Sequence, residues 1–285
     1  MSIPFVPEAV PPSTPTPVWV RLSRFGLGIG VGGMIGFGMV VPAIALFGGG
    51  LLALSAGWSY WVRARARRYD AATHEVLRAL GRGDRTRVRS ILTPWLHRGP
   101  AFVRVHARHN LAWSELTGGD AATAIRLLAA SEGEAKALRT VGMHATCAVN
   151  LALAHALLGE LAAAHAWLAE TDRRMAAATS RSSTDQAMKT YVRAILDCRE
   201  GRPADAARAL ADAWAELEAL LTGGTARPLR ILRAFATAVA DPRDAGKADR
   251  LLTPPSYPGE YDFLAAAWPE MGAFLAAHQL GADAS

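Results

Sequence analysis

The chain has 285 residues, a formal net charge of +6 and only two cysteines, Cys147 and Cys198. Two thiols on separate predicted helices are more often small buried side chains than a disulfide, so a disulfide-held fold is not expected. The positive charge is concentrated between Arg63 and Arg108, where twelve arginines stand against three acidic residues.

The first 18 residues contain six prolines and are predicted to form a disordered tail. An uncharged run follows, with no acidic, basic or histidine residue between Arg24 and Arg63. A single membrane span needs about 20 apolar residues, and this run is close to twice that length. Residues 19–62 are therefore predicted to be a transmembrane segment. A two-helix hairpin that turns at Pro42, or at Gly48–Gly50, is favoured over a single long span.

The arginines beside this run predict its orientation. Positive flanks stay on the cytoplasmic side of a membrane, so both models predict an inner-membrane protein with its C-terminal domain in the cytoplasm. Residues 63–68 form a basic juxtamembrane collar, which is expected to contact anionic lipid headgroups. Its arginines are Arg63, Arg65, Arg67 and Arg68. Nucleic acid is a less favoured partner, because no stacking aromatic residues are interleaved with the arginines.

Glycines fill the first half of the uncharged run. The spacing of Gly28, Gly32 and Gly36 allows two helices to approach closely in lipid, which favours packing within the hairpin or a homo-oligomer. Gly28-x-Gly30-x-x-Gly33 matches a dinucleotide-binding fingerprint, but neither a strand before it nor a polar helix after it is predicted. No cofactor is expected.

Residues 69–222 contain a repeated helical pattern, and strand-like alternation is nearly absent, so the fold class is predicted to be all-α. Four glycine turns recur at intervals of 36, 40 and 42 residues, at Gly83, Gly119, Gly159 and Gly201. Five residues after each glycine stands a small or modest side chain: Val88, Ala124, Ala164 and Ala206. Nine residues after each glycine stands a leucine: Leu92, Leu128, Leu168 and Leu210. The offset of four places both positions on one helix face.

This pattern resembles the tetratricopeptide repeat family over residues 69–222. Asn110-Leu111-Ala112-Trp113 and Asn150-Leu151-Ala152-Leu153 also align in the first helices of two successive units. The first and fourth repeats are degenerate, and the spacing is longer than is usual for the family. The resemblance implies an α-solenoid of helix–turn–helix repeats with a concave groove that binds a protein or peptide.

One face of the predicted first helices is expected to line this groove. The two asparagines would hydrogen-bond a bound peptide there, although helix packing with solvated polar edges is the alternative interpretation. The candidate groove residues are His106, His109, Asn110, Trp113, Asn150, Leu153 and Tyr191.

Residues 223–285 are predicted to be a degenerate repeat followed by a capping helix. One helix is expected at 227–240, a second from Asp241-Pro242 to about Leu252, and a final helix over 262–280 that contains Pro269.

Metal or catalytic chemistry is not predicted. His144 and Cys147 have i, i+3 spacing, but a zinc site needs three or four ligands, and no catalytic motif is present. The sequence therefore favours a membrane-anchored cytoplasmic scaffold or adaptor that is not an enzyme. A self-assembling structural membrane protein and a basic nucleic-acid-associated regulator are the alternatives.

Overall fold

The computed structural model describes residues 42–137, 141–177, 182–221 and 225–281. All regular elements in these ranges are helices, which confirms the all-α prediction. The chain divides near residue 71 into two compact units. The larger unit holds the four glycine turns and the C-terminal helices.

Helix α2, Pro42–Leu80, is one continuous helix of 39 residues. Pro42 stands at its first position, where the missing N–H costs no hydrogen bond. Gly48–Gly50 lie inside the helix and form no turn. The arginines of the predicted collar also lie inside it.

The prediction of a transmembrane hairpin is wrong for the described residues, because none of their helices combines the length and the apolar character needed to cross a membrane. The uncharged part of α2 includes Ser55, Gly57 and Ser59, and arginines follow from Arg63. The assignment to the inner membrane falls with the hairpin. The predicted first arm, with its glycine spacing, and the Pro-rich tail lie outside the described residues.

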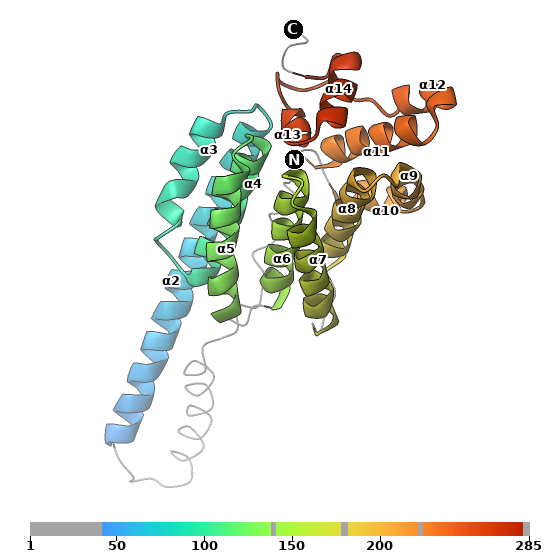
Figure 1. Cartoon of the computed structure of the whole chain (residues 1–285). Helices are drawn as coiled ribbons and strands as arrows, with labels where there is room; N and C mark the ends of the chain where they lie inside the picture. The colour runs from blue at the N-terminus through green and yellow to red at the C-terminus, as the bar shows by residue number, and fades with distance from the viewer. Residues whose placement is uncertain (1–41, 138–140, 178–181, 222–224, 282–285) are drawn as a thin grey trace. The chain divides into compact units, whose positions relative to one another are not determined.

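The repeated part of the chain folds into stacked helix pairs (Figure 1). Its helices are α3 (Arg85–Leu92), α4 (Ala101–Thr117), α5 (Ala121–Ala137), α6 (Val141–Leu157), α7 (Leu161–Ala176), α8 (Ser183–Arg199) and α9 (Pro203–Asp212), with the 3-10 helix η1 (Thr93–Trp95) between α3 and α4. Helix α4 packs on α5, α6 on α7, and α8 on α9. Contacts of α5 with α6 and of α6 with α8 join successive pairs.

The same hydrogen-bonded turn closes the first helix at each repeated glycine. The four glycines have φ between 71° and 83°, a left-handed conformation that glycine adopts without strain. The residue after each glycine donates its N–H to the carbonyl five residues back. These bonds join Asp84 to Ala79 (2.9 Å), Asp120 to Glu115 (2.9 Å), Glu160 to His155 (2.9 Å) and Arg202 to Asp197 (2.8 Å). This is the bonding of a Schellman cap.

The repeated apolar positions pack as the pattern predicts. All eight side chains at the small and leucine positions are buried: Val88, Ala124, Ala164 and Ala206, and Leu92, Leu128, Leu168 and Leu210. Each second helix thus buries one face against its neighbours, because residues four apart lie above one another on a helix.

The C-terminal part contains shorter helices than the sequence suggests. They are α10 (Trp214–Leu220), α11 (Ala226–Ala240), the 3-10 helix η2 (Pro242–Asp244), α12 (Ala245–Asp249), α13 (Asp262–Ala265) and α14 (Pro269–Ala277). Helix α11 confirms the helix expected at 227–240. The single helix predicted over 262–280 is wrong, because Trp268 is not helical (φ −142°, ψ 87°) and Pro269 begins a new helix.

Candidate functional site

The structure places the seven predicted groove residues on three successive first helices. His106, His109, Asn110 and Trp113 lie on α4, Asn150 and Leu153 on α6, and Tyr191 on α8. All seven side chains are buried, with none more than 5% exposed. They form one row across the stack, but the row is not an open groove in this structure. Contact with a partner stays a prediction.

His109, Cys147 and Asn150 meet between α4 and α6. His109 Nε2 lies 2.9 Å from Cys147 Sγ, and Asn150 Nδ2 lies 3.5 Å from His109 Nδ1. The sequence does contain a signal for this contact, because the repeat interval of 40 sets His109 level with Val149, between Cys147 and Asn150. The spacing within one helix pairs Cys147 with His144 and does not indicate its contact with His109.

A cysteine, a histidine and an asparagine are also the residue types of one nucleophilic triad, but their environment opposes that chemistry. Burial lowers the pKa of His109 to about 3, with a further contribution from His106. Burial raises the pKa of the Cys147 thiol, whereas a nucleophilic cysteine needs a lowered pKa. The group is therefore a neutral imidazole beside a protonated thiol.

A small cavity adjoins this group and has a volume of about 10 Å³. That is space for about one water molecule, so the cavity holds no substrate as it stands. Its walls are His109, Ala112, Trp113, Leu116, Leu128, Asn150 and Leu153. Four of the seven predicted residues thus surround one small space.

Two polar atoms of the row lack hydrogen-bond partners in the part of the chain that the structure describes. They are Asn150 Oδ1 and the hydroxyl of Tyr191. Burial raises the pKa of Tyr191, so its hydroxyl is protonated and can donate a hydrogen bond. Buried polar groups in folded proteins are usually paired, so these two atoms call for an explanation.

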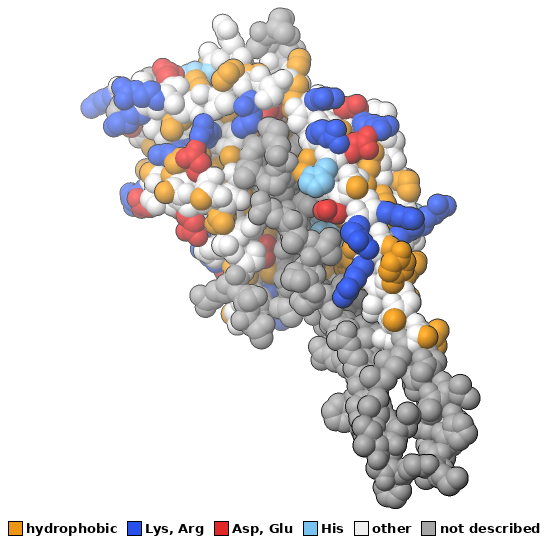
Figure 2. Space-filling view, turned by 180° about the vertical axis from the view of Figure 1, so that it is seen from behind, with side chains coloured by type: hydrophobic (Ala, Val, Ile, Leu, Met, Phe, Trp, Pro, Cys, Tyr) orange, Lys and Arg blue, Asp and Glu red, His pale blue; other side chains and the backbone are white. Residues whose placement is uncertain are grey.

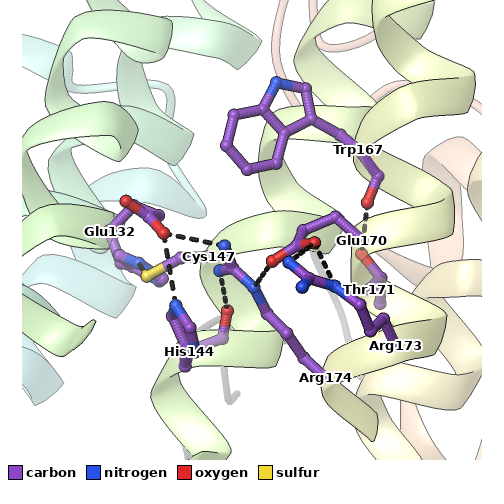
Figure 3. Close-up of polar contacts among 9 residues, drawn as sticks. Glu132, His144, Cys147, Trp167, Glu170, Thr171, Arg173 and Arg174 are labelled. Atoms are coloured by element: carbon purple, nitrogen blue, oxygen red, sulfur yellow. Dashed lines mark hydrogen bonds and ion pairs between the residues drawn. The ribbon is translucent and has the colours of Figure 1, made fainter. Parts of the chain in front are cut away.

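A second polar cluster joins α5, α6 and α7 around Arg174 (Figure 3). Arg174 donates to Glu132 on α5 (2.7 Å), to the backbone carbonyl of His144 on α6 (2.8 Å) and to Glu170 on its own helix (2.5 Å). His144 Nε2 also lies 3.2 Å from Glu132. Since the Arg174 side chain is only 9% exposed, the cluster is a buried link between two helix pairs.

The remaining predicted sites have simpler positions. No group of three or more potential metal ligands is assembled among the residues that the structure describes. On α2, Arg63, Arg67 and Arg68 are exposed and Arg65 is half-buried. Their interpretation as lipid contacts depended on the membrane segment and is not retained. Figure 2 shows hydrophobic side chains beside arginines along α2, and Trp58, Tyr60 and Trp61 are exposed there.

Comparisons with known proteins give no family for this chain. No protein-family model, no curated protein and no solved structure matches it significantly. The resemblance to the tetratricopeptide repeat family therefore stands on the residues of the chain itself.

Proposed function

We propose that the stacked helix pairs form a surface that binds a protein or peptide partner. Helical repeat arrays expose extended surfaces built from equivalent positions of successive repeats. In this chain Asn110 on α4, Asn150 on α6 and Tyr191 on α8 follow one another at intervals of 40 and 41 residues. A row at the repeat interval suits a ligand that runs along the stack.

Two atoms of this row carry the proposal, because they lack hydrogen-bond partners among the described residues. A buried polar atom without a hydrogen bond costs about 1–3 kcal/mol, and Asn150 Oδ1 and the Tyr191 hydroxyl both lie in this position. An accepting oxygen on one helix and a donating hydroxyl on the next suit the N–H and C=O groups of a peptide. Retaining such groups against their cost to stability is typical of binding sites.

Capture of partners by matched variants tests this proposal. Full-length wild-type protein, Asn150→Leu and Tyr191→Phe are tagged, mildly cross-linked in cells and purified, and the captured proteins are compared. Both variants remove an unpartnered oxygen, so we expect equal or higher thermal stability together with loss of a partner that the wild type retains. Gln186→Ala, at an exposed position of the same helix as Tyr191, is the control and should retain that partner. The proposal fails if both row variants keep every partner, or if the wild type captures only copies of itself.

A further inference from the structure

The chain after α12 folds back over the end of the stack where the glycine turns lie (Figure 1). Residues 253–268, here called the return segment, include α13 and four aromatic side chains. Tyr261, Phe263 and Trp268 are buried and Tyr257 is half-buried. The segment therefore contributes a large apolar surface to its contacts.

Three contacts link the return segment to separate repeats. The ring of Tyr257 lies so close to the first repeated turn that a methyl group on Gly83 would stand 2.7 Å from its Cδ2 atom. Phe263 packs edge-on against Trp113 of α4, with ring centroids 6.1 Å apart. Arg199 at the end of α8 donates to the carbonyl of Ala267 (2.9 Å), and its guanidinium lies 4.6 Å from the centre of the Trp268 ring.

Charge complementarity adds to these contacts. The return segment contains Glu260 and Asp262 and has no lysine or arginine, whereas Arg199 on α8 and Arg227 on α11 contact it. Arg227 on α11 forms a two-pronged ion pair with Glu260, at 2.7 and 3.0 Å. The pair is largely withdrawn from water, since the Glu260 side chain is 7% exposed.

The return segment keeps its shape through its own backbone. Its backbone–backbone hydrogen bonds are local, such as Glu260 N to Tyr257 O (3.2 Å) and Leu264 N to Tyr261 O (2.9 Å). The Tyr261 hydroxyl donates to Thr253 O (3.0 Å) and closes the loop on itself. The bonds described above between segment and array come from side chains. The segment thus resembles a preorganised ligand that docks as a unit.

We propose that the return segment is an internal ligand of the array, and that its surface accepts a partner peptide of the same chemistry. That peptide is a short turn-forming segment with acidic residues and aromatic side chains spaced to reach Gly83, Trp113 and Arg199. Phe263 contacts Trp113, which lines the small cavity together with Asn150, so displacement of the segment would open this cavity toward Asn150. This inference rests on the proposed function and names its regulation.

Tethering explains why the site is closed in the intact chain. A covalently linked ligand has an effective concentration of about 1 mM or more, so it excludes a free peptide of the same sequence that is present at micromolar concentration. Weakening one anchor of the tethered copy should therefore admit the free peptide.

The probe is a fluorescent synthetic peptide of residues 253–268. Fluorescence anisotropy is measured with full-length wild type, with Phe263→Ala and with Gln186→Ala, an exposed control position outside the segment. We expect Phe263→Ala to bind the peptide at least about tenfold more tightly than the wild type or the control. A peptide carrying Glu260→Gln should bind Phe263→Ala more weakly, because it loses the charged partner of Arg227. A scrambled peptide should not bind.

Hydrogen exchange on the wild type provides a test that does not depend on a variant's folding. Amides of 253–268 should exchange as one group, at least about tenfold faster than those of α6, since a docked ligand opens before the stack unfolds. Exchange of both regions at a single rate, or no peptide binding by a Phe263→Ala protein with wild-type helical content, would overturn the proposal. Dimerisation of that variant in sedimentation would make a second copy the occupant and overturn the assignment to a partner peptide.

The experiments distinguish failure of the proposed function from failure of the proposed regulation by the return segment. If the peptide binds but the Asn150 and Tyr191 variants keep their partners, the polar row is not the binding surface and only the docking of the segment stands. If the row variants lose their partner while the peptide never binds, the proposed function stands without this regulation.

Discussion

At the scale of single residues, the repeated glycines are the positions where backbone conformation decides stability. Gly119 has φ of 83° and a Cβ added there would meet nothing within 4 Å, so its conformation alone opposes a side chain. Gly133 lies in the interior of α5 and also faces open space. The two positions separate the cost of a left-handed residue from the cost of helical glycine.

Gly119→Ala should therefore destabilise the protein by about 1 kcal/mol, because alanine is strained in the left-handed region. Gly133→Ala should stabilise it by up to about 1 kcal/mol, because alanine is the better helix former. Urea unfolding of both variants against wild type measures the two changes. Equal effects of the same sign would contradict this account of the turns.

The buried histidines of α4 make stability depend on pH. Burial lowers the pKa of His106 to about 4 and that of His109 to about 3, below the usual value of about 6.5. The unfolded chain therefore takes up protons first as the pH falls. Stability that is fully present above pH 6.5 should decline towards pH 4, by about 2 kcal/mol per histidine between pH 6.5 and 5. Asp185 acts in the opposite direction, because burial raises its pKa to about 6.

Urea unfolding at pH 7, 6 and 5 measures this dependence. His109→Gln should lose stability less steeply than the wild type as the pH falls, because it removes one group that takes up a proton when the chain unfolds. Asp185→Asn should lose stability more steeply, because it removes the opposing contribution. Parallel profiles for all three proteins would show that these groups do not control the dependence.

At the scale of helices, each pair depends on a small side chain where the second helix meets its neighbours. Ala164 on α7 is fully buried, whereas Ala166 on the same helix is exposed. Both residues are alanines, and both are replaced by leucine, so the change in helix propensity is the same at the two positions. A comparison of the two variants therefore isolates the effect of packing.

Ala164→Leu should cost about 1–3 kcal/mol, because extra methylene groups in a packed interface force neighbouring side chains out of place. Ala166→Leu should change the free energy of unfolding by less than about 0.5 kcal/mol. Thermal and urea unfolding compare the two. A tolerated leucine at Ala164 would mean that the pair is packed more loosely than described.

Prediction from sequence succeeded for the repeated helices and their turns, but it failed for α2 and for residues 262–280, and it failed where distant parts of the chain meet. The turn at Gly119 and the buried faces at Ala164 and Leu168 follow from spacing within one unit, so they could be predicted. The contact between Phe263 and Trp113 joins the end of the chain to its second repeat, and no local pattern encodes it. The predicted groove residues were therefore expected at a surface, whereas the structure buries them.

At the scale of the whole molecule, ion pairs tie successive repeats together. Arg174 is buried and joins three helices, whereas the neighbouring Arg173 side chain is 76% exposed and, among the described residues, pairs with Glu170 of its own helix. Removal of one partner from a buried pair leaves an uncompensated charge, which exposed pairs avoid.

Arg174→Met should therefore destabilise the protein by about 3 kcal/mol, and Arg173→Met by no more than about 0.5 kcal/mol. Chemical unfolding followed by far-ultraviolet circular dichroism measures both. Since Glu132 and His144 belong to adjacent pairs, Arg174→Met should also broaden the transition as the repeats uncouple. Similar losses in the two variants would argue against the buried link.

The position of Tyr257 over Gly83 has a consequence for the order in which the protein is made. The first repeat emerges from the ribosome long before Tyr257 is synthesised, and domains generally begin to fold from the N-terminal end during synthesis. The first turn and the ring of Trp113 must therefore wait, without their final neighbours, until nearly the whole chain has emerged. During that interval the nascent array presents to other proteins a surface that the finished molecule covers.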